Sequence, residues 1–302
     1  MEKLPKYLVA YDGSSHSKAA LDWAIMLGCV TGAEIEAVKV FEPIVRHYTS
    51  GDYNITTRIA EQFDEMEKAD QQMMEEAKLF KKNTCDVAVK TKILKGPVAA
   101  TLLEYAEKNG FDMIVAGTKG HGLLEEIIVG SVTSSLVALA KAPVMVVTDQ
   151  REAAALKKII VAYDGSSYAK KALELAIDIG KKAGACLVVA KVLDPVELAM
   201  IYSKVQPGSE IKIGTYLIEQ DEANKKILDD AKAMGASKGV DVESILLAGG
   251  NIAEAIVHYT ENEKADIIVA GTLGKGLLDE LLVGSVAKNL VTLAQMPVIV
   301  AK

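Results

Sequence analysis

The sequence predicts an α/β protein built from two tandem doubly wound domains. Three observations support this prediction. The chain has 302 residues, which is about two domains of roughly 150 residues each. Short apolar runs alternate with amphipathic helical patterns, as expected for a mainly parallel sheet with helices on both faces. The second half of the sequence also repeats the first half.

The repeat is clearest in two segments. Residues 7–21 and 159–173 are identical at ten of 15 positions, and residues 114–132 and 268–286 at 14 of 19. The offset between the copies is 152 at the first segment and 154 at the second, so the second copy carries two extra residues between its second strand and its third helix. A period of this length indicates a duplicated domain rather than a solenoid.

The elements of the first copy follow in the order β-α-β-α-β-α-β-α-β. Strands are expected at residues 7–11, 34–41, 87–94, 113–116 and 144–147, and helices at 15–30, 59–82, 98–108 and 131–141. In the second copy, strands are expected at residues 159–163, 186–193, 241–248, 267–270 and 298–301. The polar connector at 148–158 separates a first domain, residues 1–150, from a second, residues 156–302.

Composition excludes several classes of protein. A net charge of −7 argues against a nucleic-acid binder, whose affinity depends on clustered Lys and Arg. No run of 18 apolar residues and no signal peptide is found, so we expect no membrane span and a cytoplasmic location. The three cysteines form no C-x-x-C pair. We expect them to be buried thiols in a reducing compartment, and the four histidines form no metal-ligand cluster.

The first motif that carries chemistry is Asp12-Gly13-Ser14-Ser15, repeated as Asp164-Gly165-Ser166-Ser167. Each copy directly follows a strand, at the edge of the sheet where ligands of open parallel sheets bind. The aspartate could accept a hydrogen bond from a ribose hydroxyl or join a metal bound to phosphates. Alternatively, the Asp or Ser residues simply cap the following helix.

The second motif is G-x2-G-x9-G-S, and it follows the fourth strand of each copy. Glycines let the backbone approach a phosphate closely, and the final Gly-Ser opens a helix whose N-terminus favours an anion. The alternative is a pair of tight turns that need positive φ. The duplication at matching places favours the phosphate site. The motif is formed by Gly117, Gly120, Gly130 and Ser131, and by Gly271, Gly274, Gly284 and Ser285.

This pattern, on a domain that opens with V-A-Y-D-G-S, resembles the ATP-binding branch of the universal stress protein family in tandem form. The resemblance covers nearly all of the chain. It implies a five-stranded parallel sheet in each domain, of the adenine nucleotide alpha hydrolase-like type, and an internal pseudo-dimer formed through the last strands. Association of two chains into a homodimer is a further expectation.

The resemblance also implies roles for individual residues. Asp12 and Asp164 would line the nucleoside part of the site, and Val40 and Val192 would receive adenine. The phosphate motifs would hold the phosphates, with Val132 and Thr133 as further donors. The whole expected nucleotide-binding set is Ala10, Asp12, Val40, Gly117, Lys119, Gly120, His121, Gly130, Ser131, Val132, Thr133, Ala162, Asp164, Val192, Gly271, Gly274, Lys275, Gly284, Ser285 and Val286.

The two copies differ at three site positions. Thr133 aligns with Ala287, Lys119 with Leu273 and His121 with Lys275. The first site therefore offers more side-chain donors, and we expect it to bind ATP more tightly than the second.

The leading functional hypothesis is a stress-response or signalling protein that binds ATP or AMP. Its nucleotide occupancy would alter its conformation or its choice of a protein partner, whose identity the sequence does not give. The sequence has no Walker loop, no nucleophile elbow and no assigned catalytic residue. Two alternatives stay open: a slow ATPase with a metal such as Mg²⁺ held at Asp12 or Asp164, and an interaction module with vestigial sites.

Overall fold

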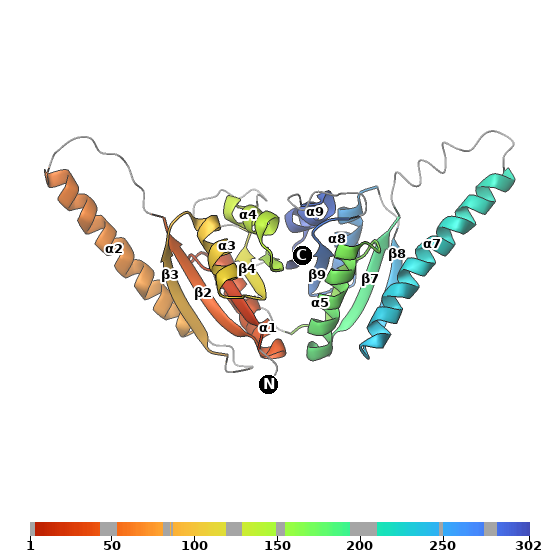
Figure 1. Ribbon diagram of the computed structural model, residues 1–302, viewed down its shortest axis with the longest axis horizontal. Helices are drawn as coiled ribbons and strands as arrows, with labels where there is room; N and C mark the ends of the chain where they lie inside the picture. Colours follow the sequence, from red (N-terminus) through yellow and green to blue (C-terminus); the bar gives the residue numbers. More distant parts are fainter. Residues whose placement is uncertain are drawn as a thin grey trace.

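In a computed structural model, the chain forms two similar halves that lie side by side (Figure 1). The structure describes residues 4–42, 53–80, 85, 87–118, 129–148, 155–193, 210–247, 250–274 and 283–302. In two long helices, side chains are described only from residue 65 and from residue 222 onward.

Both halves have the predicted alternation of strands and helices. The first half contains β1 Lys6–Ala10, α1 Ser15–Thr31, β2 Glu34–Phe41, α2 Tyr53–Lys78, β3 Val89–Lys95, α3 Val98–Lys108, β4 Met113–Gly117, α4 Ser131–Leu139 and β5 Val144–Val147. The second contains β6 Lys158–Ala162, α5 Ser167–Ala183, β7 Cys186–Val192, α7 Glu210–Ser237, β8 Val242–Leu247, α8 Ile252–Asn262, β9 Ile267–Gly271, α9 Ser285–Leu293 and β10 Val298–Ala301.

Most predicted bounds agree to within one or two residues, but α2 differs. The helix expected at 59–82 spans Tyr53–Lys78, because its charged pattern, typical of a solvated helix, does not define where it starts.

All ten strands form one sheet in the order β3-β2-β1-β4-β5-β10-β9-β6-β7-β8. Within each half the neighbouring strands are parallel, and β5 pairs antiparallel with β10, with Met145 opposite Ile299. This arrangement confirms the predicted five-stranded parallel halves and their pairing through the last strands. In each half the order of strands reverses between the first and fourth strands, which creates a switch point.

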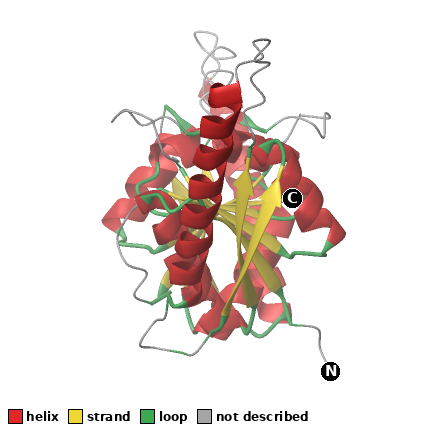
Figure 2. Cartoon of the chain, turned by 90° about the vertical axis from the view of Figure 1, so that its left-hand side faces the viewer, coloured by secondary structure: helices red, strands yellow, loops and turns green. Residues whose placement is uncertain are grey.

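Helices cover both faces of the sheet, as Figure 2 shows from the α2 side. The buried residues of α1, α2, α5 and α7 form one apolar core with one face of the sheet, and those of α3, α4, α8 and α9 form a second core with the other face. Both cores contain residues from both halves. The central strands are rich in Val, Ile and Ala because strands covered on both faces have no solvated side.

The expectation of three free cysteines is wrong for two of them. Cys29, near the end of α1, and Cys85, between α2 and β3, form a disulfide with a Cα–Cα distance of 5.9 Å. The two residues are 56 positions apart, so only the tertiary structure brings them together. Cys186 is a partly buried free thiol, and its burial raises its pKa.

No helix in the described ranges is long and apolar enough to cross a membrane.

Candidate functional site

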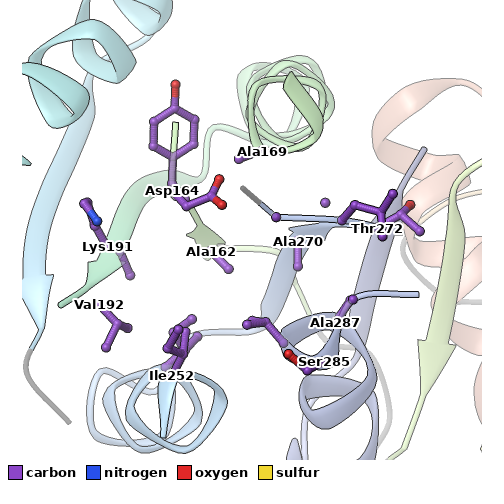
Figure 3. Close-up of a pocket in the computed structure, with 18 residues that line it drawn as sticks. Ala162, Asp164, Ala169, Lys191, Val192, Ile252, Ala270, Thr272, Ser285 and Ala287 are labelled. Atoms are coloured by element: carbon purple, nitrogen blue, oxygen red, sulfur yellow. The ribbon is translucent and has the colours of Figure 1, made fainter. Parts of the chain in front are cut away.

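A cavity of about 310 Å³ lies at the carboxyl ends of the strands in the second half (Figure 3). It sits at the switch point between β6 and β9, where ligands of doubly wound sheets bind. The start of α9 and the inner side of α8 form the opposite wall. The lining residues are Ala162, Tyr163, Asp164, Ala169, Ala190, Lys191, Val192, Ile252, Ile256, Ala270, Gly271, Thr272, Leu273, Gly274, Gly284, Ser285, Val286 and Ala287.

Eight of the residues predicted for the second site line this one cavity: Ala162, Asp164, Val192, Gly271, Gly274, Gly284, Ser285 and Val286. The ninth, Lys275, lies outside the described residues. The second-copy residues chosen from the two motifs and the second strand are therefore brought together in space.

The aspartate motif starts a helix in both halves. The backbone N–H of Ser166 donates to Oδ1 of Asp164 at 2.9 Å, and the Ser166 hydroxyl accepts from the N–H of Ala169 at 3.2 Å. Asp12 and Ser14 make the same contacts at 3.0 Å and 3.2 Å. The serines thus cap α1 and α5, as the alternative reading expected. Asp164 uses Oδ1 in this turn, and its Oδ2 lies beside Gly274, 3.0 Å from where a Cβ at that glycine would be.

The first glycine of the phosphate motif is required by packing. A Cβ at Gly271 would lie 2.7 Å from the backbone carbonyl carbon of Tyr168, and one at Gly117 would lie 2.7 Å from that of His16. The backbone of the first turn of α5 therefore packs directly against the last residue of β9, and that of α1 packs in the same way against β4. The alternative reading, positive φ, does not hold for Gly117, Gly130, Gly271, Gly274 or Gly284, since none of them has positive φ.

The last glycine of the motif closes a loop and starts a helix. The N–H of Gly284 donates to the carbonyl of Thr272 at 2.8 Å, and that of Gly130 to Thr118 at 2.7 Å. Gly284 and Gly130 are the N-cap residues of α9 and α4, and neither helix has a side-chain cap. Two helices thus begin here with a glycine N-cap, which has no side chain to bond to their first N–H groups.

The hydroxyl of Thr133, which was expected to donate to a phosphate, is bonded within the protein. Its side chain is buried, and its hydroxyl donates to the carbonyl of Gly117 at 2.7 Å. A hydroxyl has one hydrogen, so the same group does not donate to a phosphate in this arrangement. Ala287, at the equivalent place, lines the second cavity.

The first-half site is only partly within the described residues. Ala10, Asp12 and Val40 lie at the ends of β1 and β2, and Val132 follows the start of α4. Ser131 is exposed at the first position of α4. Lys119, Gly120 and His121 lie outside the described residues.

Several lining residues were missed from the sequence. Ile252 and Ile256 are four residues apart on α8, and Ala190 is two residues from the predicted Val192 on β7. These spacings place each pair on one face of its element, and that periodicity could have found them. Leu273 and Lys191 are also buried against the cavity.

The pKa of Tyr163 is raised by burial and by Asp230 and Asp164, so its hydroxyl stays protonated at neutral pH.

No group of three or more His, Cys, Asp or Glu side chains in the described part of the chain is placed to hold a metal ion.

The fold and the cavity together define a tandem α/β protein with a glycine-lined pocket at a switch point of its sheet. The sequence model of the universal stress protein family matches residues 4–148 and 155–302. The chain therefore belongs to the universal stress protein family.

Two of the similar proteins match this chain along nearly its whole length, and a third matches about half of it. A universal stress protein of Mycolicibacterium smegmatis is 27% identical over 300 residues, which cover 98% of this chain and 96% of the relative. Universal stress protein MJ0531 of Methanocaldococcus jannaschii is 36% identical over 147 residues, 48% of this chain and 82% of the relative. The crystal structure of a universal stress protein from Archaeoglobus fulgidus has a TM-score of 0.65 at 20% identity and covers 100% of this chain and 99% of its own.

Proposed function

We propose that this protein binds adenine nucleotides, ATP or AMP, and that occupancy changes its conformation or its choice of protein partner. The observation that carries the proposal is the second-half cavity, which has three chemically different parts. Its volume of about 310 Å³ falls at the lower end of the range of small-molecule sites.

The apolar part of the cavity suits a flat base. Ala190 and Val192 on β7 and Ile252 and Ile256 on α8 line this part of the cavity, and Val192 lies beside Ile252 (Figure 3). These four side chains offer no charge, so a purine would be held there by burial of its faces and by backbone groups.

The two polar parts suit a ribose and a phosphate. Asp164 is an acceptor when ionised, so it favours hydroxyl donors such as those of ribose and repels phosphate. The uncapped start of α9, with Gly284 and Ser285, supplies N–H groups and a favourable dipole for an anion. The cavity therefore orients a nucleotide with its sugar at β6 and its phosphates at α9.

A metal ion would have to bind with the nucleotide. Asp12 or Asp164 would contribute one carboxylate, and phosphate oxygens and water would complete the shell, as is usual for Mg²⁺.

We also propose that the two sites differ in their preference for phosphate charge. Leu273 is buried against the second cavity, where the first copy has Lys119. Because Thr133 is bonded to Gly117, the proposed difference depends on this position and on His121 and Lys275, and no longer on the threonine.

Titration calorimetry with ATP and AMP tests the proposal. Gly284→Val places a branched side chain 3.2 Å from the Thr272 carbonyl, and we expect it to weaken the second site at least about tenfold. Gly130→Val should do the same at the first site. Gly250→Val is the matched control, because a Cβ there meets nothing within 4 Å. Wild-type protein that takes up neither nucleotide, and that carries none by mass spectrometry when purified, would contradict the proposal.

The proposed difference between the two sites is tested by exchanging the residues at one equivalent position. We expect Lys119→Leu to weaken ATP more than AMP at the first site, and Leu273→Lys to strengthen ATP at the second. Equal residual ATP affinities in Gly130→Val and Gly284→Val would argue that the sites are equivalent.

A further inference from the structure

We propose that Cys29 and Cys85 form a redox modification site that locks helix α2 onto the sheet in the first half only. Reduction of the disulfide would release the C-terminal end of α2, whereas α7 in the second half would not respond. This proposal does not depend on nucleotide binding.

The disulfide lies in the connection that follows α2, which is longer than the connection that follows α7. The connection from α2 to β3 spans residues 79–88, whereas the connection from α7 to β8 spans only residues 238–241. A cross-link that closes a longer stretch of chain restricts more conformations. Cys85 lies within the longer connection, and its bond to Cys29 ties this connection to α1.

The second half replaces the disulfide with a contact that is not redox-active. Lys181 aligns with Cys29, and the short connection 238–241 takes the place of the longer connection that holds Cys85. The Lys181 ammonium donates to the carbonyl of Lys238 at 2.6 Å, and a Cβ at Gly239 would lie 3.9 Å from the same nitrogen. Each half therefore joins this connection to the first helix of its own half, covalently in the first half and by a hydrogen bond in the second.

In the described part of α2, two side chains, Met74 and Ala77, are buried in the core, and Met73 packs against it. Asp70 pairs with Lys39 at 3.5 Å and Glu67 with Lys95 at 3.6 Å, and such ion pairs near the surface contribute little. The docking of this end of α2 is therefore expected to be sensitive to the disulfide.

The two cysteines do not lie in the fully buried part of the core. Cys29 and Cys85 are only partly buried, and a disulfide that forms in a reducing compartment is typically transient and redox-sensing. Cys186 has no second cysteine beside it within the described residues.

The oxidant we assign is a low-molecular-weight disulfide. One protein thiolate attacks a sulfur of this reagent, forms a mixed disulfide and expels one small thiolate. The second protein thiolate then attacks the mixed disulfide and expels the other. Two protein thiols are oxidised, one small disulfide is reduced to two thiols, and the two protons pass to the expelled thiolates.

Hydrogen exchange of the full chain, after treatment with glutathione disulfide or with a phosphine reductant, tests the site. We expect reduction to speed exchange at residues 65–78 of α2 at least about tenfold, with residues 222–237 of α7 unchanged. Peptide mapping should find the Cys29–Cys85 cross-link only in the oxidised sample. The double variant Cys29→Ser/Cys85→Ser should exchange like the reduced protein in both treatments, and Cys186→Ser should respond like the wild type.

Two results would overturn the proposal. One is equal exchange of α2 in both treatments although the cross-link forms. The other is the absence of the cross-link after oxidation. A response of α7 equal to that of α2 would equally exclude a lock confined to the first half.

Discussion

At the scale of single residues, the phosphate motif contains glycines with different tasks. Gly117 and Gly271 let the first turn of a helix touch the end of a strand, whereas Gly130 and Gly284 close a loop and start a helix. A pattern of glycines that resembles a ligand site is thus partly a packing requirement. The two tasks can be separated by measuring stability and binding independently.

We expect Gly271→Ala to lower the free energy of unfolding by roughly 1–3 kcal/mol, because its Cβ would overlap backbone atoms of Tyr168 that cannot move away. Urea denaturation measures this change. Gly250→Ala is the control, since its Cβ meets nothing within 4 Å, and it should be nearly neutral. Equal stability of the two variants would show that the close contact between Gly271 and the backbone of Tyr168 is absent in solution.

A second prediction concerns Thr133. Thr133→Ala leaves the buried carbonyl of Gly117 without its hydroxyl donor, and we expect a loss of about 1–3 kcal/mol in the free energy of unfolding. Thr133→Ser keeps a hydroxyl and should recover part of that loss. ATP affinity measured on the same samples should change little. A large loss of affinity at unchanged stability would instead make Thr133 a phosphate ligand.

At the scale of elements, the helices that begin at the site start in two ways. α5 begins with a serine that caps it, whereas α9 begins at a glycine and has no side-chain cap. The first arrangement satisfies the helix N-terminus internally, and the second leaves it available to a ligand. Two serines at the second site therefore have opposite expected roles.

We expect Ser166→Ala to cost about 1 kcal/mol of stability, because the N–H of Ala169 loses its acceptor. Ser285→Ala should change stability by less than about 0.5 kcal/mol, since its side chain is exposed, while it weakens nucleotide binding. Thermal unfolding and calorimetry on both variants provide the comparison. The assignment fails if Ser285→Ala destabilises the protein as much as Ser166→Ala does.

At the scale of the whole molecule, the two halves share one sheet and both cores. Besides the β5–β10 pairing, Thr148 donates to the carbonyl of Met296 at 3.1 Å, and Lys182 to that of Thr31 at 3.3 Å. Lys302, at the end of β10, donates to the carbonyl of Val137 in the other half. Pairing of this kind makes independent unfolding of one half unfavourable.

Lys302 gives this interface a pH dependence. Burial lowers its pKa from 10.5 to about 8. Between these values the unfolded chain binds more protons than the folded chain, so the contribution of Lys302 makes stability rise with pH from about 8 to about 10.5. Below pH 8 the folded protein carries the full cost of the buried charge.

Urea denaturation of wild type and Lys302→Met between about pH 7.5 and pH 10 tests the predicted rise of stability with pH. The wild type should gain stability relative to the variant as pH rises through this interval. Lys288→Met, which removes a charge from an exposed position of α9, controls for net charge. A stability difference between wild type and Lys302→Met that stays constant or reverses with pH would contradict the assignment.

Much of this protein was determined by local sequence pattern. Apolar runs and helical periodicity predicted the alternating elements, and the repeat predicted two equivalent halves, because these signals depend only on neighbouring residues. The second-copy residues Asp164, Gly271 and Gly284 were found to line one cavity because each lies at or near the end of a strand or the start of a helix, and the topology brings such positions to one edge of the sheet.

Only the tertiary structure decided which distant groups meet. The hydroxyl of Thr133 has an acceptor 16 residues away, Cys29 a partner 56 residues away and Lys302 an acceptor in the other half of the molecule. The burial of Leu273 likewise follows from the shape of the cavity rather than from its neighbours in sequence. Side chains of these types can make many alternative contacts, and the packing of whole helices against the shared sheet selects one of them.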